Sequence, residues 1–237
     1  MSAILLAILI TVAAALFPAL MVIPALLVEH RWSSRAWSEA AAELGLQRPK
    51  TQRLTGQIDG WPVEVSMGGP GKNQVLRVRV TGAPTGFALQ AQNALRGLFS
   101  GHVPVTGDVA FDRITAARVP ARELGLLGPK VRAAFLACSA LGDPVVDDGV
   151  VELLVLGSPY RADVLVRQVH SAVALVAALQ HSGGPVRELS VLARTDPVPE
   201  VRARMLAALA EVSWAAAEAV ALDVRYDPHP TPRLAAA

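Results

Sequence analysis

An unbroken apolar run opens the chain, from Ala3 to Val28, and Glu29, His30 and Arg31 follow it. No polar stripe interrupts the run, although the buried helix of a globular domain normally has one. At about 1.5 Å per residue, a helix of this length is long enough to cross a hydrocarbon core of about 30 Å. The pattern predicts a single N-terminal transmembrane helix within residues 1–30, which contacts membrane lipid through residues 3–28.

Charged and aromatic residues after the run set its expected orientation. A cleaved signal peptide would have basic residues before its apolar core, and this chain has none there. Arg31 and Arg35 follow the run, so the positive-inside rule favours a cytoplasmic globular domain on a single-pass protein of the bacterial inner membrane. The opposite orientation stays open. Trp32 and Trp37 either anchor the chain at the membrane interface with these arginines or belong to the core of the next domain.

Alternating apolar and polar positions predict a β region after residue 50. The segments Gln52–Ile58 and Trp61–Met67 flank Asp59-Gly60, a dipeptide typical of a tight type I′ hairpin. A third strand is expected from Gln74 to Thr81, with Leu76, Val78 and Val80 on one face and arginines on the other. The pattern predicts an antiparallel sheet with one face in solvent.

The middle of the chain mixes helix and strand signals. A short strand is expected at residues 87–90, and residues 109–119 are expected to supply one or two more. Helices are predicted from Pro129 to Leu141 and from Tyr160 to Gln180, and Asp148-Gly149 predicts a second hairpin between them. Hairpins with interleaved helices predict an α+β domain over residues 31–184.

The last part of the chain, residues 185–225, is predicted to be a helical pair. The turn Asp196-Pro197-Val198-Pro199 and the following Glu200-Val201-Arg202, with apolar residues behind them, resemble the turn and second helix of a HEAT-type repeat. That resemblance implies a binding surface. A single repeat cannot bury its own apolar face, so the pair must pack on the α+β domain or on another subunit. Residues 226–237 are expected to form a disordered tail.

A second resemblance is broader and carries no known activity. Residues Trp37 to Gln180, with Thr106-Gly107-Asp108 and Phe111-Asp112, are similar to uncharacterised bacterial membrane-anchored proteins that end in such helices.

Composition narrows the function classes. The formal net charge is only +2, which argues against a nucleic-acid partner. Aromatic residues make up 5% of the chain, so Leu, Val and Ala must form the core. The only cysteine, Cys138, lies in an apolar helical pattern and is interpreted as a buried structural thiol.

Candidate catalytic groups are few. Asp108 and Asp112 are the most concentrated acidic residues of the sheet region, but on a strand a separation of four residues is about 13 Å. Turn capping by Asp108 and an ion pair of Asp112 with Arg113 or another arginine are the favoured interpretation. The five histidines lack metal-ligand spacing. No catalytic residue, cofactor or metal site is predicted.

The sequence therefore predicts a membrane-anchored scaffold or protein-interaction protein without catalytic activity. Its protein partner is expected to contact the outer face of the second terminal helix, at Arg202 and Arg204. Two alternatives stay open. One is a membrane-tethered enzyme or a small-ligand-binding domain with a pocket between sheet and helices. The other is a homo-oligomer formed through small residues of the apolar run.

Overall fold

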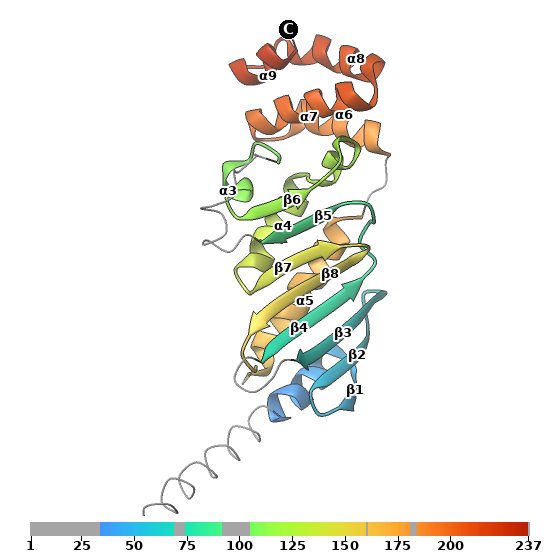
Figure 1. Cartoon of the computed structure of the whole chain (residues 1–237), viewed down its shortest axis with the longest axis vertical. Coiled ribbons are helices and arrows are strands. Elements are labelled where there is room, and N and C mark those ends of the chain that lie inside the picture. Colours follow the sequence, from blue (N-terminus) through green and yellow to red (C-terminus); the bar gives the residue numbers. More distant parts are fainter. Residues whose placement is uncertain (1–33, 69–73, 92–104, 160, 181–183, 237) are drawn as a thin grey trace, which may run out of the picture.

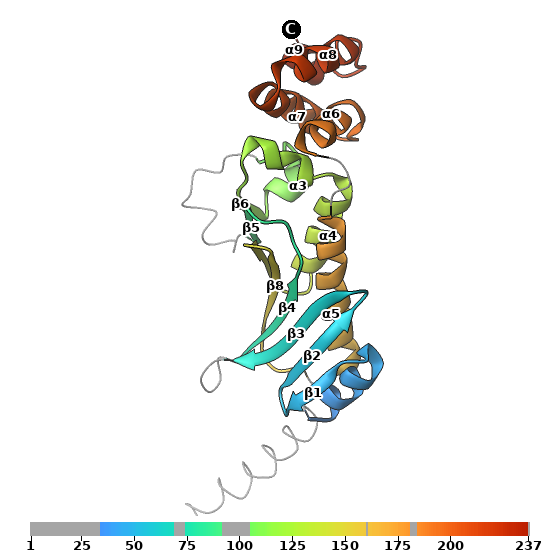
Figure 2. The ribbon, with the colours of Figure 1, turned by 90° about the vertical axis from the view of Figure 1, so that its right-hand side faces the viewer.

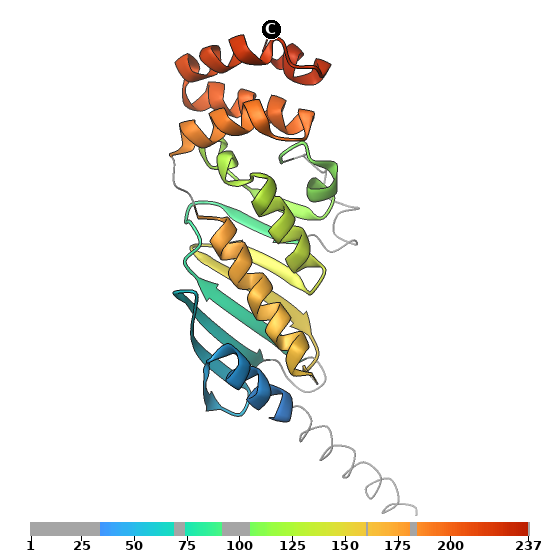
Figure 3. The same ribbon diagram turned by 180° about the vertical axis from the view of Figure 1, so that it is seen from behind.

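An eight-stranded antiparallel sheet forms the body of the molecule, with helices on one face and a helical stack beyond one edge (Figures 1 and 3). This architecture comes from a computed structural model, which describes residues 34–68, 74–91, 105–159, 161–180 and 184–236. The strand order is β1-β2-β3-β4-β8-β7-β5-β6. The prediction of an α+β fold with an antiparallel sheet is confirmed.

Strands and helices are interleaved up to β8, and the described elements after it are helical. The strands are β1 (Gln47–Lys50), β2 (Arg53–Ile58), β3 (Trp61–Gly68), β4 (Val75–Thr81), β5 (Ala88–Ala91), β6 (Thr115–Arg118), β7 (Asp143–Asp147) and β8 (Val150–Leu156). The helices are one over residues 34–44, α3 (Val109–Asp112), the 3₁₀ helix η1 (Ala121–Leu126), α4 (Pro129–Ser139), α5 (Ala162–Ala178), α6 (Pro185–Thr195), α7 (Pro199–Val212), α8 (Trp214–Val224) and α9 (Pro230–Ala235).

Two Asp-Gly turns set the register of the sheet. Asp59 and Gly60 have φ angles of 52° and 84°, and Ile58 pairs with Trp61 across the turn. Asp148 and Gly149 have φ angles of 43° and 81° in the turn between β7 and β8. Left-handed backbone at both central residues is the conformation that a type I′ turn requires. Both predicted hairpins are therefore confirmed.

The sheet has one buried and one uncovered face. Leu76, Val78 and Val80 of β4 are buried, whereas Arg77 and Arg79 between them are exposed. Helix α5 packs on β4 and β8, and α4 packs on α5 and β7, all on the buried side (Figure 3). The uncovered face carries surface ion pairs such as Arg53–Glu64, which contribute little to stability.

The segment over residues 109–119 differs from the strand pair that the sequence allowed. It begins with the short helix α3, because the Asp108 carboxylate accepts hydrogen bonds from the N–H groups of Ala110 and Phe111 and so caps the helix. Only residues 115–118 form a strand, β6, at the edge of the sheet. Strand β1 at the opposite edge was not predicted.

The predicted transmembrane helix is corrected. No helix among the described residues is long and apolar enough to span a membrane. Helix α5, with 17 residues, is shorter than the roughly 20 residues that a membrane span needs, and it packs on the sheet. Residues 3–28, Arg31 and Trp32 lie outside the described residues. The placement in the bacterial inner membrane is therefore not upheld, and neither is the orientation derived from it.

Cys138 lies where the sequence placed it, in the core. Its side chain is buried between α4 and α5, with Sγ 3.2 Å from the Ser171 carbonyl oxygen and 3.1 Å from its hydroxyl oxygen. Burial raises the pKa of the Cys138 thiol, because the apolar surroundings disfavour the thiolate, although the Ser171 hydroxyl partly offsets this effect.

We expect the native Cys138 thiol to be inert. At pH 8, a thiol-specific disulfide reagent should modify it about a hundredfold more slowly in buffer than in denaturing urea, since reaction requires opening of the core. The time course of absorbance from the released chromophore measures both rates. The raised pKa also predicts that the thiol's contribution to stability is lost as the pH rises above about 8.5, where the unfolded chain ionises first. Equal rates in the two solvents would contradict the buried position.

Candidate functional site

The helical end is built in layers. The inner layer is η1, which packs against both α6 and α7. Helix α7 in turn packs against α8 and α9, which form the outermost layer at the tip of the molecule (Figures 1 and 2). The α+β domain therefore covers one side of the α6–α7 pair, which is the first of the two arrangements that the sequence left open, and the chain's own last helices cover the other.

The second terminal helix, which the sequence pattern predicted from Glu200 to about Val220, is shorter than predicted. Helix α7 ends at Val212, because Ser213 adopts an extended conformation (φ −156°, ψ 100°) and its hydroxyl accepts a hydrogen bond from the Ala216 N–H to cap α8. Residues 230–235, where a disordered tail was expected, form α9, with Pro232 buried. The serine cap was visible in the sequence, but the alanine-rich segments on both sides of it masked the break.

A buried ion-pair network joins the helical end to the sheet domain. The Arg132 guanidinium donates two parallel hydrogen bonds of 2.9 Å to the Asp196 carboxylate, and its Nε donates to Asp108 Oδ2 at 2.8 Å. Its Nη1 also donates to the Leu127 carbonyl. The Arg132 side chain is 4% exposed and that of Asp196 is fully buried. Through Arg132, Asp108 and Asp196 therefore hold together three segments that are distant in sequence.

Asp112 organises the turn before α3. Its carboxylate accepts hydrogen bonds from the N–H and hydroxyl of Thr106 and from the N–H of Gly107. Gly107 has a φ of +94°, and a Cβ there would lie 2.9 Å from the backbone of Glu200 at the start of α7. Only glycine allows this close approach. The turn is therefore a support for α7, and Asp108 and Asp112 have structural roles.

Arg202 does not lie on an outer face. It is buried, donates paired hydrogen bonds of 2.8 Å to the Asp227 carboxylate, and also donates to the Asp196 carbonyl oxygen. Arg202 thus ties the segment between α8 and α9 back to the start of α7. The Arg202 guanidinium lowers the pKa of the Asp227 carboxyl by hydrogen bonding to its charged form.

The other residues singled out from the sequence differ in their exposure. Arg204 is exposed on α7, as a partner-binding residue must be. Trp37 is fully buried and belongs to the core, which is the second of the two roles considered for it. Arg35 is exposed and pairs with Glu39 one helical turn away. Arg31 and Trp32 lie outside the described residues.

Large apolar side chains are exposed on the outermost layer. Trp214, Leu222 and Tyr226 are 73%, 56% and 75% exposed, and we call them the terminal apolar surface. Their spacing of eight and four residues places them along one side of α8 and its C-terminal turn. The Arg225 guanidinium lies 4.6 Å from the centre of the Tyr226 ring. Leu234 is a further exposed apolar residue, on α9, which packs against α8.

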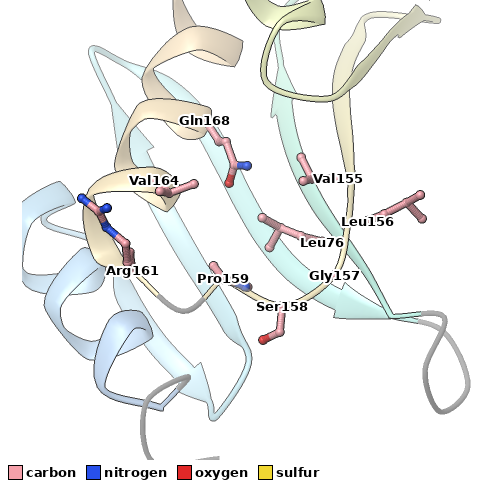
Figure 4. A pocket seen from close by; sticks show the side chains of 9 residues that line it. All are labelled: Leu76, Val155, Leu156, Gly157, Ser158, Pro159, Arg161, Val164 and Gln168. Carbon is pink, nitrogen blue, oxygen red and sulfur yellow. The ribbon is translucent and has the colours of Figure 1, made fainter. Parts of the chain in front are cut away.

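A pocket lies between the start of α5 and the ends of β4 and β8 (Figure 4). Its volume is about 280 Å³. Most of its lining residues are apolar, among them Leu76, Val155, Pro159 and Val164, and the polar ones are Ser158, Arg161 and Gln168. The Arg161 side chain at its margin forms a bidentate ion pair with Asp163. The pocket is thus a mostly apolar hollow between sheet and helix.

Gln168 is the buried polar residue that lines this pocket, and it was not predicted from the sequence. Its side chain is 4% exposed, and its Oε1 atom is buried without a hydrogen-bond partner. An unpaired buried acceptor costs about 1–3 kcal/mol. The signal available in the sequence was a glutamine in the inward stripe of α5, between Leu165 and Ala172, where every buried neighbour is apolar.

The network predicts that the stability of the protein is sensitive to substitution of Arg132. Replacing Arg132 with methionine leaves the buried Asp196 carboxylate without its countercharge, so we expect the free energy of unfolding to fall by about 3–5 kcal/mol. Urea unfolding at pH 7 measures the change. Arg122→Met is the matched control, because Arg122 is exposed and its loss should change the value by less than about 1 kcal/mol. Equal effects of the two variants would refute the role of the network.

The Arg202–Asp227 pair predicts a dependence on pH. Because the folded-state pKa of Asp227 is lowered, its stabilisation is present above the unfolded carboxyl pKa of about 3.9 and is lost as the pH falls further. Asp227→Asn should therefore lower stability at pH 7 by about 1–2 kcal/mol, and its difference from the parent should shrink below pH 4. Thermal unfolding between pH 7 and pH 3 tests this, with the exposed Asp143→Asn as control. A difference independent of pH would contradict the assignment.

Among the described residues, no group of three or more His, Cys, Asp or Glu side chains is placed to hold a metal ion. Comparisons with protein-family models, with curated proteins and with solved structures gave no match. The likeness of residues 185–225 to a HEAT-type repeat therefore stays a prediction from the sequence.

Proposed function

We propose that this protein is a protein-interaction module that binds an amphipathic helix of a partner protein on its terminal apolar surface. The observation that carries the proposal is the exposure of Trp214, Leu222 and Tyr226 along one side of the outermost helix. Full burial of a large apolar side chain contributes about 1.5–3 kcal/mol, and tryptophan and tyrosine are enriched among the residues that dominate interfaces.

The form of α8 favours a helix as the occupant. Ala215 and Ala219 lie beside the large residues and are exposed, so a partner helix can approach closely between them. Every inner layer of this end is already covered by another helix, and the outer face of α8 is the next position in that series. A partner helix lying there would bury its apolar stripe against α8.

Charge on α8 adds a requirement on the partner. Glu218 lies midway between Trp214 and Leu222 on the same side of the helix and is exposed. A carboxylate at this position favours a lysine or arginine opposite it and disfavours an acidic residue. The proposed ligand is therefore an amphipathic helix with a basic residue within its apolar stripe.

Site-specific photocrosslinking tests the proposal. A photoreactive phenylalanine analogue at Leu222 of the full chain, in cells that make the protein naturally, should give one discrete adduct, mapped by mass spectrometry to an amphipathic helix. The same analogue at Val109, which is 78% exposed on α3, is the matched control and should not give that adduct. With the purified partner, Trp214→Ala and Leu222→Ala should each raise Kd at least about tenfold. Val109→Ala should change it less than about twofold.

Two outcomes would overturn the proposal. The same adducts at Leu222 and Val109 would mean that α8 makes only non-specific contacts. An adduct between two copies of this chain would replace the proposal with self-association through the same surface. Arg202→Ala is not a suitable test variant. Arg202 is buried, and its loss would disturb the position of α8 and α9.

A further inference from the structure

We propose that the pocket between α5 and strands β4 and β8 binds a small apolar ring compound that donates one hydrogen bond to Gln168. The pocket is separate from the terminal apolar surface, because its lining comes from α5, β4, β8 and the turn between β8 and α5 (Figure 4). The inference therefore does not rest on the proposed interaction with a partner helix.

The first argument is the unsatisfied amide. Gln168 Oε1 is buried and has no hydrogen-bond partner, while the side chain is 4% exposed. In Figure 4 the carboxamide points from α5 into the space between Val164 and Leu76. Buried polar atoms of native proteins are paired in about nine cases of ten, so an unpaired one that faces a hollow indicates a missing partner.

The second argument is the chemistry of the walls. Leu76, Val155, Pro159 and Val164 supply apolar lining, while Ser158 also lines the pocket and Arg161 at its margin is paired with Asp163. An apolar body fits these walls, and a carbonyl oxygen accepts only from an N–H or O–H group. The combination therefore selects a ligand with an apolar body and a single donor on its edge, and it disfavours ions and strongly polar molecules.

The third argument is size. The pocket has a volume of about 280 Å³. An apolar cavity of about 150 Å³ is known to accommodate benzene, and pockets for drug-sized ligands begin near about 300 Å³. The present pocket thus fits a one- or two-ring compound. Indole has this form, because it is an apolar bicyclic ring with one N–H donor.

Calorimetric titration of the full chain with a matched set of compounds tests the inference. Indole should bind about tenfold more tightly than indene, which has nearly the same shape but lacks the N–H group. Gln168→Leu removes the acceptor and retains the side chain's approximate size. In that variant the two compounds should bind equally, within about twofold, since the preference depends on the one hydrogen bond.

A second pair of variants keeps the test decisive if Gln168→Leu changes the fold. Val164→Phe places a ring in the pocket and should abolish indole binding. Ala174→Phe adds the same ring to an exposed position on the same helix and should leave binding unchanged. Circular dichroism of each variant establishes that it is folded before titration.

Several results would overturn the inference. They are the absence of indole binding, equal binding of indole and indene by the parent chain, and indole binding that survives Val164→Phe. Tighter binding of benzofuran than of indole would also overturn it, because benzofuran carries an acceptor in place of the donor. Each of these results leaves the crosslinking test of the terminal apolar surface unaffected.

Discussion

The buried guanidinium of Arg132 is the interaction on which the arrangement of the two parts of this molecule depends. It belongs to α4, and its two carboxylate partners lie 24 residues before it and 64 residues after it. Replacing such a set with apolar residues is often neutral, whereas removing one member leaves a buried charge without a partner. The network therefore determines how the helical end sits on the sheet domain more than it adds net stability. Asp196 also orders the turn before α7, since its Oδ1 accepts a hydrogen bond from the Val198 N–H.

Each layer of the helical end is covered by the layer outside it. Helices α6 and α7 cover η1, and α8 and α9 cover α7. The last layer has no further helix among the described residues, and its outer face retains Trp214, Leu222 and Tyr226. In stacked-helix proteins the terminal layer normally has a polar outer face. The exposed apolar side chains of α8 depart from that rule, which is the physical basis for proposing that this end binds a partner.

The sequence predicted the local features of the fold and missed the long-range ones. The hairpins at Asp59-Gly60 and Asp148-Gly149 were predictable because a left-handed turn is decided by two adjacent residues. The role of Arg132 was not predictable, because its partners are distant in sequence and many other arginines could have paired with the same carboxylates. Arg202 illustrates the same limit, since a charged residue on a predicted helix is usually exposed, yet this one is buried against Asp227. The apolar run at residues 3–28 matched a membrane span by length and composition alone.

The buried charges of this protein are paired. Arg132, Asp196 and Arg202 each have charged partners at hydrogen-bond distance. Four buried side-chain atoms of the described residues lack a hydrogen-bond partner: Trp37 Nε1, Arg53 Nε, Thr115 Oγ1 and Gln168 Oε1. The Arg53 guanidinium is nevertheless ion-paired with Glu64 through Nη2, and the other three residues are neutral. An unpaired charge in the core would cost several times more than an unpaired hydroxyl or amide, so a folded chain can tolerate only the latter. Thr115 is enclosed at the sheet edge, whereas Gln168 lines a hollow that a ligand can enter. The cost of an unpaired neutral amide is therefore small enough for a marginally stable protein to remain folded while that amide stays free to bind a ligand.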